Sequence, residues 1–84
     1  MKINFKEVKV ATSIKKDNYR VEDMRENLAN AIYNNESNIA YMALAMKIYN
    51  SDGEVELDEK ETTLLKNFCK NLPLVVQDAL GLLQ

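Results

Sequence analysis

The segment from Ile39 to Tyr49 constrains the fold more than any other, because almost all of its residues are apolar. It reads Ile-Ala-Tyr-Met-Ala-Leu-Ala-Met-Lys-Ile-Tyr, and Lys47 is its only charged residue. Ser37 or Asn38 can accept a hydrogen bond from an unpaired backbone N–H at its start, so the pattern predicts a capped helix. A helix that is apolar on every side is buried, either by its own domain or by a partner. We therefore predict that this segment is the central helix of the fold.

The length of the chain predicts a single domain over residues 1–84, since domains typically contain about 50 to 250 residues. A chain of 84 residues buries only about 60% of its unfolded surface, so association with another chain is expected. The hydrophobic fraction of 46% and the small number of Gly and Pro residues argue against disorder.

The residues that most enzymes and metal sites use are scarce. The sequence has no His, which removes the usual general base near neutral pH and the commonest metal ligand. The single cysteine, Cys69, has no partner for a disulfide or a Cys-based zinc site. It falls on an apolar stripe beside Phe68 and Leu72, which predicts a buried structural thiol. Gly53 and Gly81 are the only glycines, so no phosphate-binding loop is expected. We predict a protein that is not an enzyme, needs no cofactor and has no small-molecule substrate.

Alternating apolar residues predict a β-hairpin over residues 1–21. The alternation changes phase at Lys6-Glu7, which indicates a bulge or bend, and the polar residues 15–18 indicate the turn. The alternating apolar residues are Ile3, Phe5, Val8, Val10, Tyr19 and Val21.

Two capping boxes predict the starts of helices further along the chain. Asp23 is followed three residues later by Glu26, and Asp58 by Glu61. In each pair the two side chains can accept hydrogen bonds from backbone N–H groups that the first turn leaves unpaired. Helices are therefore predicted to begin directly after Asp23 and Asp58.

The remaining signals complete a helical body over residues 22–84. Residues 54–57 alternate polar and apolar side chains and predict a short strand. Pro73 interrupts the helical pattern and predicts a last helix that begins at its position. The predicted fold class is therefore α+β, with a small N-terminal β-hairpin and one short strand packed on three to four helices.

The net charge of −2 averages two unlike parts. Residues 1–20 carry six basic and two acidic side chains, whereas residues 21–84 carry five basic and eleven acidic ones. Such a division can mark a nucleic-acid or partner surface. It also fits a basic segment that lies beside the acidic residues 52–61 in the fold. The basic residues, taken as the candidate nucleic-acid contacts, are Lys2, Lys6, Lys9, Lys15, Lys16 and Arg20.

The acidic segment 52–61 has some features of a calcium-binding loop, because a helix, an Asp-Gly turn and a Glu-containing helix follow one another. With Gly53 at the invariant glycine, however, the first ligand position is Ile48. The pattern therefore predicts a solvated turn with a capping box, and we expect no metal site.

No membrane segment is predicted. The longest stretch without Asp, Glu, Lys or Arg is Ser37–Met46, which is far shorter than the roughly 20 residues needed to span a bilayer. Charges interrupt the first residues of the chain, so they do not have the apolar run of a secretory signal. We predict a cytoplasmic protein.

Three motifs resemble small uncharacterised proteins encoded by bacterial phages and prophages. They are Asn-Ala-Ile-Tyr at 30–33, Ile-Tyr at 48–49 and Gly-Glu-Val-Glu at 53–56. The resemblance covers about residues 22–83 and implies an accessory or assembly-type protein that works by contact. It carries over no catalytic or ligand-binding residues.

These observations predict a non-enzymatic protein that binds a protein partner or itself through apolar helix surfaces. The alternative is a small regulator that contacts nucleic acid through the basic hairpin. Four hydrophobic residues exceed what one small core needs and are the predicted interface: Tyr41, Leu44, Val76 and Leu82.

Overall fold

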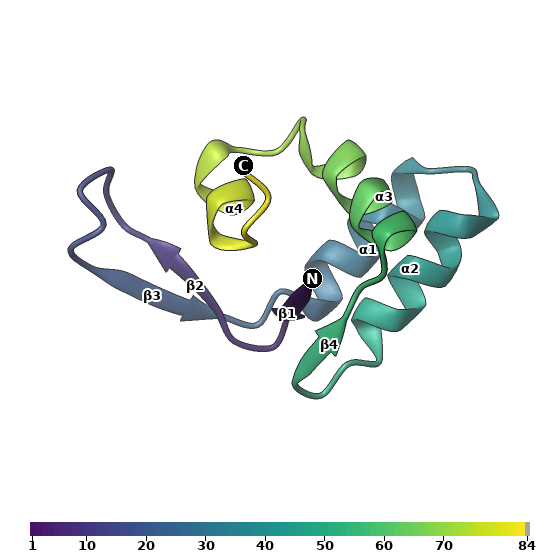
Figure 1. Cartoon of the computed structure of the whole chain (residues 1–84), viewed down its shortest axis with the longest axis horizontal. Helices are drawn as coiled ribbons and strands as arrows, with labels where there is room; N and C mark the ends of the chain where they lie inside the picture. Colours follow the sequence, from purple (N-terminus) through teal and green to yellow (C-terminus); the bar gives the residue numbers. More distant parts are fainter. Residues whose placement is uncertain (84) are drawn as a thin grey trace.

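A computed structural model describes residues 1–83 and shows an α+β fold, as predicted (Figure 1). The described part of the chain contains two antiparallel two-stranded sheets and four helices. The elements are β1 (Lys2–Asn4), β2 (Val8–Ala11), β3 (Tyr19–Glu22), α1 (Arg25–Asn35), α2 (Ile39–Tyr49), β4 (Glu54–Glu56), α3 (Glu59–Cys69) and α4 (Leu74–Ala79). None of the helices within residues 1–83 has the length and apolarity needed to cross a bilayer.

The predicted N-terminal hairpin is present but shorter than expected. Strands β2 and β3 form it, with Val8 opposite Glu22 and Ala11 opposite Tyr19. Strand β1 belongs to the other sheet, where Lys2 lies opposite Glu56 of β4. The prediction that Ile3 and Phe5 belong to the hairpin is therefore wrong.

The change of phase at Lys6-Glu7 marks a bend at the end of β1, which is one of the two predicted alternatives, and not a bulge. The side-chain oxygen Oδ1 of Asn4 accepts hydrogen bonds from the backbone N–H groups of Lys6 at 3.1 Å and Glu7 at 3.2 Å. An Asn side chain that binds the backbone two residues further on makes a turn. This turn redirects the chain, and β2 leaves β1 to pair with β3.

Helices α2 and α3 begin where the sequence predicts. Asn38 caps α2, with its Oδ1 accepting from the N–H of Ala40 at 2.8 Å. Both bonds of the second capping box are present: Glu61 N–H donates to Asp58 Oδ1 at 2.7 Å, and Asp58 N–H donates to Glu61 Oε1 at 3.0 Å. The break before Pro73 is also present, since α4 starts directly after it.

The first capping box is not formed. Met24 occupies the N-cap position of α1, so Glu26 is one residue too close to the helix start to complete the motif. Asp23 instead accepts from the N–H of Arg25 at 3.1 Å and from its guanidinium group at 2.8 and 3.0 Å. These hydrogen bonds from Arg25 lower the pKa of the Asp23 carboxyl to about 2.

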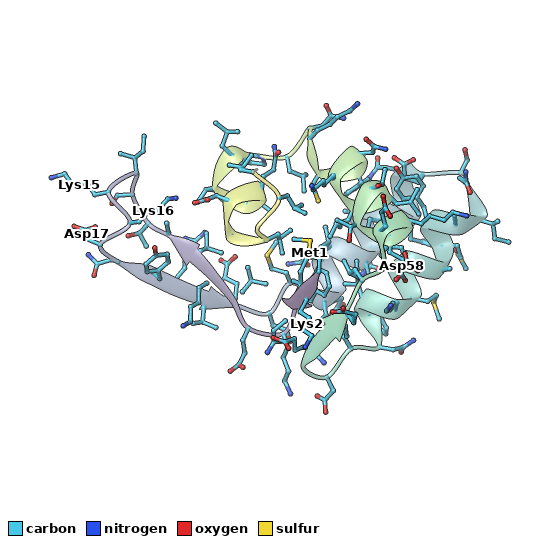
Figure 2. All side chains as sticks on the ribbon, in the orientation of Figure 1. Met1, Lys2, Lys15, Lys16, Asp17 and Asp58 are labelled. Atoms are coloured by element: carbon cyan, nitrogen blue, oxygen red, sulfur yellow. The ribbon has the colours of Figure 1, made fainter. Side chains whose placement is uncertain are left out.

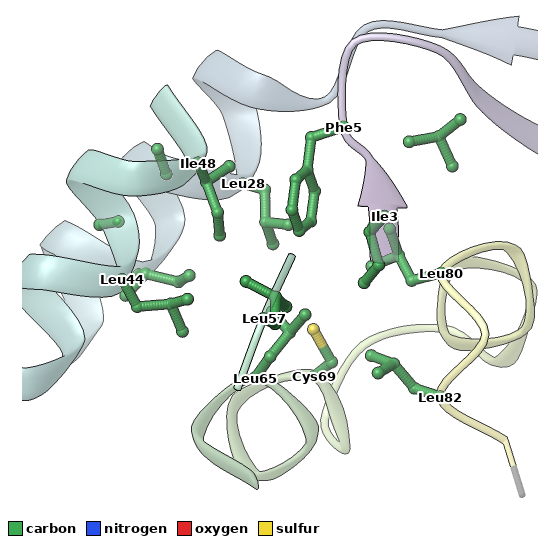
Figure 3. Close-up of a cluster of buried hydrophobic side chains, with 14 of the residues drawn as sticks. Ile3, Phe5, Leu28, Leu44, Ile48, Leu57, Leu65, Cys69, Leu80 and Leu82 are labelled. Carbon is green, nitrogen blue, oxygen red and sulfur yellow. The ribbon is translucent and has the colours of Figure 1, made fainter. Parts of the chain in front are cut away.

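The core lies where β1, α1, α2 and α3 meet, and it extends to β2 through Val8 and Val10 and to the end of α4 through Leu80 and Leu82 (Figure 3). Its fully buried large side chains are Phe5, Ile32, Leu44, Ile48, Leu57, Leu65 and Cys69. Helix α2 contributes only one face to this core, through Leu44, Ala45 and Ile48. It lies at one end of the long axis of the molecule (Figure 1), so the prediction that it is the central helix of the fold is wrong. The described part of the chain leaves its other side uncovered.

Candidate interaction surface

The outer faces of α1 and α2 form one groove. The two helices run in opposite directions and are joined by a loop of residues 36–38 (Figure 1). Each helix contributes residues spaced three, four and seven apart, which lie on one side of a helix. The residues that line the groove are Glu26, Ala29, Asn30 and Tyr33 of α1, and Met42, Ala45, Met46, Tyr49 and Asn50 of α2 or directly after it.

Four large apolar side chains of α2 point into solvent on this surface. Ile39 is 85% exposed, Met42 45%, Met46 51% and Tyr49 52%. We call these four residues the α2 seam. The one charged side chain of the helix does not interrupt it, because the Nζ of Lys47 donates to Glu61 Oε1 at 2.9 Å and to the backbone oxygen of Glu56 at 2.7 Å.

Tyr33 of α1 lies beside the seam. It lines the groove together with Tyr49, and a second hollow near the 36–38 loop together with Ile39 and Met42. The antiparallel arrangement of α1 and α2 brings Tyr33 and Tyr49 to the same side of the helix pair. Tyr41 packs against the core instead, and burial raises the pKa of its hydroxyl.

The four predicted interface residues are not the exposed ones. Leu44 is 1% exposed and Leu82 7%, so both belong to the core, while Tyr41 and Val76 are partly buried against it. The prediction is wrong for Leu44 and Leu82, because neither can reach a partner in the folded chain. Helix α2 has two apolar stripes, and Tyr41 and Leu44 lie on the one that faces the core.

The candidate nucleic-acid contacts are dispersed and partly neutralised. Lys6 pairs with Asp52 at 3.0 Å, Lys16 with Asp78 at 2.9 Å and Arg20 with Glu22 at 3.0 Å. Figure 2 shows Lys15 and Lys16 at the tip of the hairpin and Lys2 on β1, well away from it. The Lys6–Asp52 pair places part of the basic segment beside the acidic one. Such exposed pairs contribute little stability, but they reduce the positive potential that phosphates would meet.

Three of the six carboxylates of residues 52–61 make separate local contacts. Asp52 binds Lys6, Asp58 caps α3, and Glu61 binds Lys47. Within residues 1–83, no three side chains of the His, Cys, Asp or Glu types come together in a way that could hold a metal ion.

A second apolar surface lies between the hairpin and α4. Ile14, Leu74, Val75 and Leu83 are exposed there. Unlike the α2 seam, this surface is crossed by the Lys16–Asp78 ion pair and has Arg20 in its lining. The hollow between the hairpin and α4 is the larger of the two, at about 610 Å³ against about 340 Å³ for the α1/α2 groove. The groove and the α2 seam together, which we call the α1/α2 surface, differ from it because no charged side chain lies in the seam.

Cys69 is buried against the core, and its burial raises the pKa of the thiol to about 11. The thiolate is the reactive form of a cysteine, and a stable fold exposes a buried group for only about one part in 10³ of the time or less. We therefore expect Cys69 to react with a thiol reagent at mildly alkaline pH at least ~1,000-fold more slowly in the folded protein than in urea. The measurement is the labelling rate with and without denaturant. Rapid labelling of a chain that keeps its native circular dichroism would contradict the buried position.

Comparison of the chain with protein-family models, curated proteins and solved structures finds no match.

Proposed function

We propose that the protein works by binding another protein chain through the α1/α2 surface, and that it catalyses no reaction. The exposed α2 seam carries this proposal. Fully covering an Ile or Met side chain contributes about 1.5–3 kcal/mol, and monomeric proteins seldom leave such side chains contiguous in solvent. Met and Tyr are also enriched at protein interfaces, because Met adapts its shape and Tyr combines an apolar ring with a polar end.

Two of the three motifs that resemble phage and prophage proteins meet on this surface. Tyr33 ends the Asn-Ala-Ile-Tyr motif, Tyr49 ends the Ile-Tyr motif, and both side chains line the groove. This convergence supports an accessory or assembly-type role in the cytoplasm, in which the contact itself is the function. The nucleic-acid alternative has less support, because three of its six basic residues are paired with carboxylates.

A photo-crosslinking amino acid placed at Tyr49 tests the proposal. The matched control is the same amino acid at Tyr19, which is 53% exposed against 52% for Tyr49 but lies on the hairpin. In cells of the natural source, we expect the probe at Tyr49 to form a discrete adduct with a protein, including another copy of this chain, and the probe at Tyr19 to form none. No adduct at Tyr49, or the same adduct from both positions, would refute binding through the α1/α2 surface.

A further inference from the structure

We propose that the occupant of the α1/α2 surface is a second copy of this chain, with α2 packed antiparallel on α2 of that copy about a two-fold axis. This inference rests on the proposed function and names its partner. Homo-oligomers are most often two-fold dimers, and in such an interface the same patch must be complementary to itself. The α2 seam meets this requirement in both its spacing and its charge.

The spacing of the seam is the same in both directions along the helix. Ile39, Met42, Met46 and Tyr49 are separated by three, four and three residues, which is the alternation that packs one helix against another in coiled coils. When two such helices run antiparallel and cross at the level of Leu44, Met42 of each lies opposite Met46 of the other. Ile39 then lies opposite Tyr49, so every seam residue has an apolar partner.

The charge distribution also allows the surface to meet itself. In a two-fold interface, a charged group close to the axis meets the same group of the other copy, and this repulsion weakens association. The α2 seam has no charged residue, and Lys47 is directed to Glu61 and the Glu56 carbonyl on another side of the helix. Glu26 lines the α1 edge of the groove, and Glu36 lines the hollow near Ile39 and Met42, so both carboxylates lie beside the seam at the edge of the proposed contact.

The contribution of α1 favours the antiparallel orientation over the parallel one. With the two-fold axis perpendicular to the helices, α1 of one copy lies over α1 of the other and the two pairs make a four-helix arrangement. Tyr33 is then covered, whereas a parallel pair of α2 helices leaves it in solvent. A stable interface buries about 800 Å² on each partner. An aromatic side chain has about 150–250 Å² in total, so the exposed halves of Tyr33 and Tyr49 together supply about that much of the interface. The contact approaches the area of a stable interface only if Tyr33 is covered as well.

Disulfide trapping tests the orientation directly. In the antiparallel pair, residue 39 of one copy lies beside residue 49 of the other, while the two copies of residue 39 are about 15 Å apart along the axis. A disulfide requires Cα atoms within about 7 Å. We therefore expect a mixture of the Ile39→Cys and Tyr49→Cys proteins to form a mixed disulfide dimer, and either protein alone to form none. The unchanged chain is the control for Cys69, which is buried.

Sedimentation equilibrium from micromolar to millimolar concentration measures the association itself. Met46→Glu is expected to weaken the dimer more than tenfold, because each dimer then buries two unpaired carboxylates. Met and Glu have similar helix propensities, so circular dichroism should show an unchanged fold. Val21→Glu is the matched control, since Val21 is exposed and lies opposite Lys9 on the hairpin, and it should leave the dimer unchanged.

The possible results separate this inference from the proposed function. Cross-linking of Ile39→Cys alone would show a parallel pair and overturn the antiparallel one. A monomer at all concentrations, without disulfide trapping, would overturn the second copy as the occupant. In that case the proposed function still stands if the probe at Tyr49 forms an adduct with a different protein, and falls if it forms none.

Discussion

Replacement of Phe5 by alanine is expected to destabilise the fold by about 3–5 kcal/mol, the usual cost of removing a buried Phe side chain. Phe5 has no exposed surface, and Figure 3 shows its ring directed toward Leu28 and Ile48, between the end of β1 and the two antiparallel helices. Its carbonyl oxygen also accepts a hydrogen bond from Met24 N–H at 2.8 Å, which joins the entry to α1 to this strand. Domains are typically stable by about 5–15 kcal/mol, so this one substitution removes a large share of the total.

Urea denaturation followed by far-UV circular dichroism measures this effect. Tyr19→Ala is the control, because Tyr19 is an aromatic residue on a strand but is half exposed, and surface substitutions usually change stability by less than about 0.5 kcal/mol. If Phe5→Ala and Tyr19→Ala shift the urea midpoint equally, Phe5 does not occupy the centre of the core.

Glu61→Ala is expected to cost about 1–2 kcal/mol, since it removes one half of a capping box and a partly buried ion pair. One carboxylate performs both tasks: Oε1 of Glu61 accepts from Asp58 N–H at 3.0 Å and from Lys47 Nζ at 2.9 Å. The loss therefore affects the start of α3 and the contact between α3 and α2 together.

Glu61→Gln separates the two contributions. Its amide oxygen can still accept from Asp58 N–H, as Gln does in capping boxes, but it has no negative charge for Lys47. We expect Glu61→Gln to lose less stability than Glu61→Ala, as measured by the urea midpoint of each variant. Equal losses would assign the whole effect to the ion pair, and no loss in either variant would contradict the contacts of Glu61.

Local signals in the sequence predict the helices well and the strand partners poorly. Asp58 and Asn38 cap α3 and α2 through atoms two or three residues away, so their motifs suffice. At Asp23 the same reasoning fails, because the guanidinium of Arg25 binds the carboxylate and the helix starts one residue later. Strand β1 pairs with β4, which lies 50 to 54 residues further along the chain, and alternation of side chains identifies a strand but not its neighbour.

The candidate surface shows a second limit of sequence patterns. Residues 41, 44, 45 and 48 of α2 have helical spacing, and so do residues 39, 42, 46 and 49. Both stripes are apolar, so periodicity alone cannot show which one faces the core. In the structure the stripe with Leu44 and Ile48 joins Phe5 and Leu57 in the core, and these two residues adjoin the long-range β1–β4 pair.

The pairing of β1 with β4 also determines the order in which a new chain can fold on the ribosome. The Leu57 N–H group donates to the Met1 carbonyl at 2.7 Å, next to the β1–β4 pair. Strand β1 is synthesised before β4, and it stays unpaired until α1 and α2, which lie between them in the sequence, have been synthesised. The helical hairpin of α1 and α2 needs only local contacts, and local contacts form fastest. During this interval the unpaired edge of β1 and the α2 seam are exposed together, and exposed strand edges and apolar surface promote aggregation. We therefore expect the nascent chain, rather than the folded protein, to be the species most in need of a chaperone.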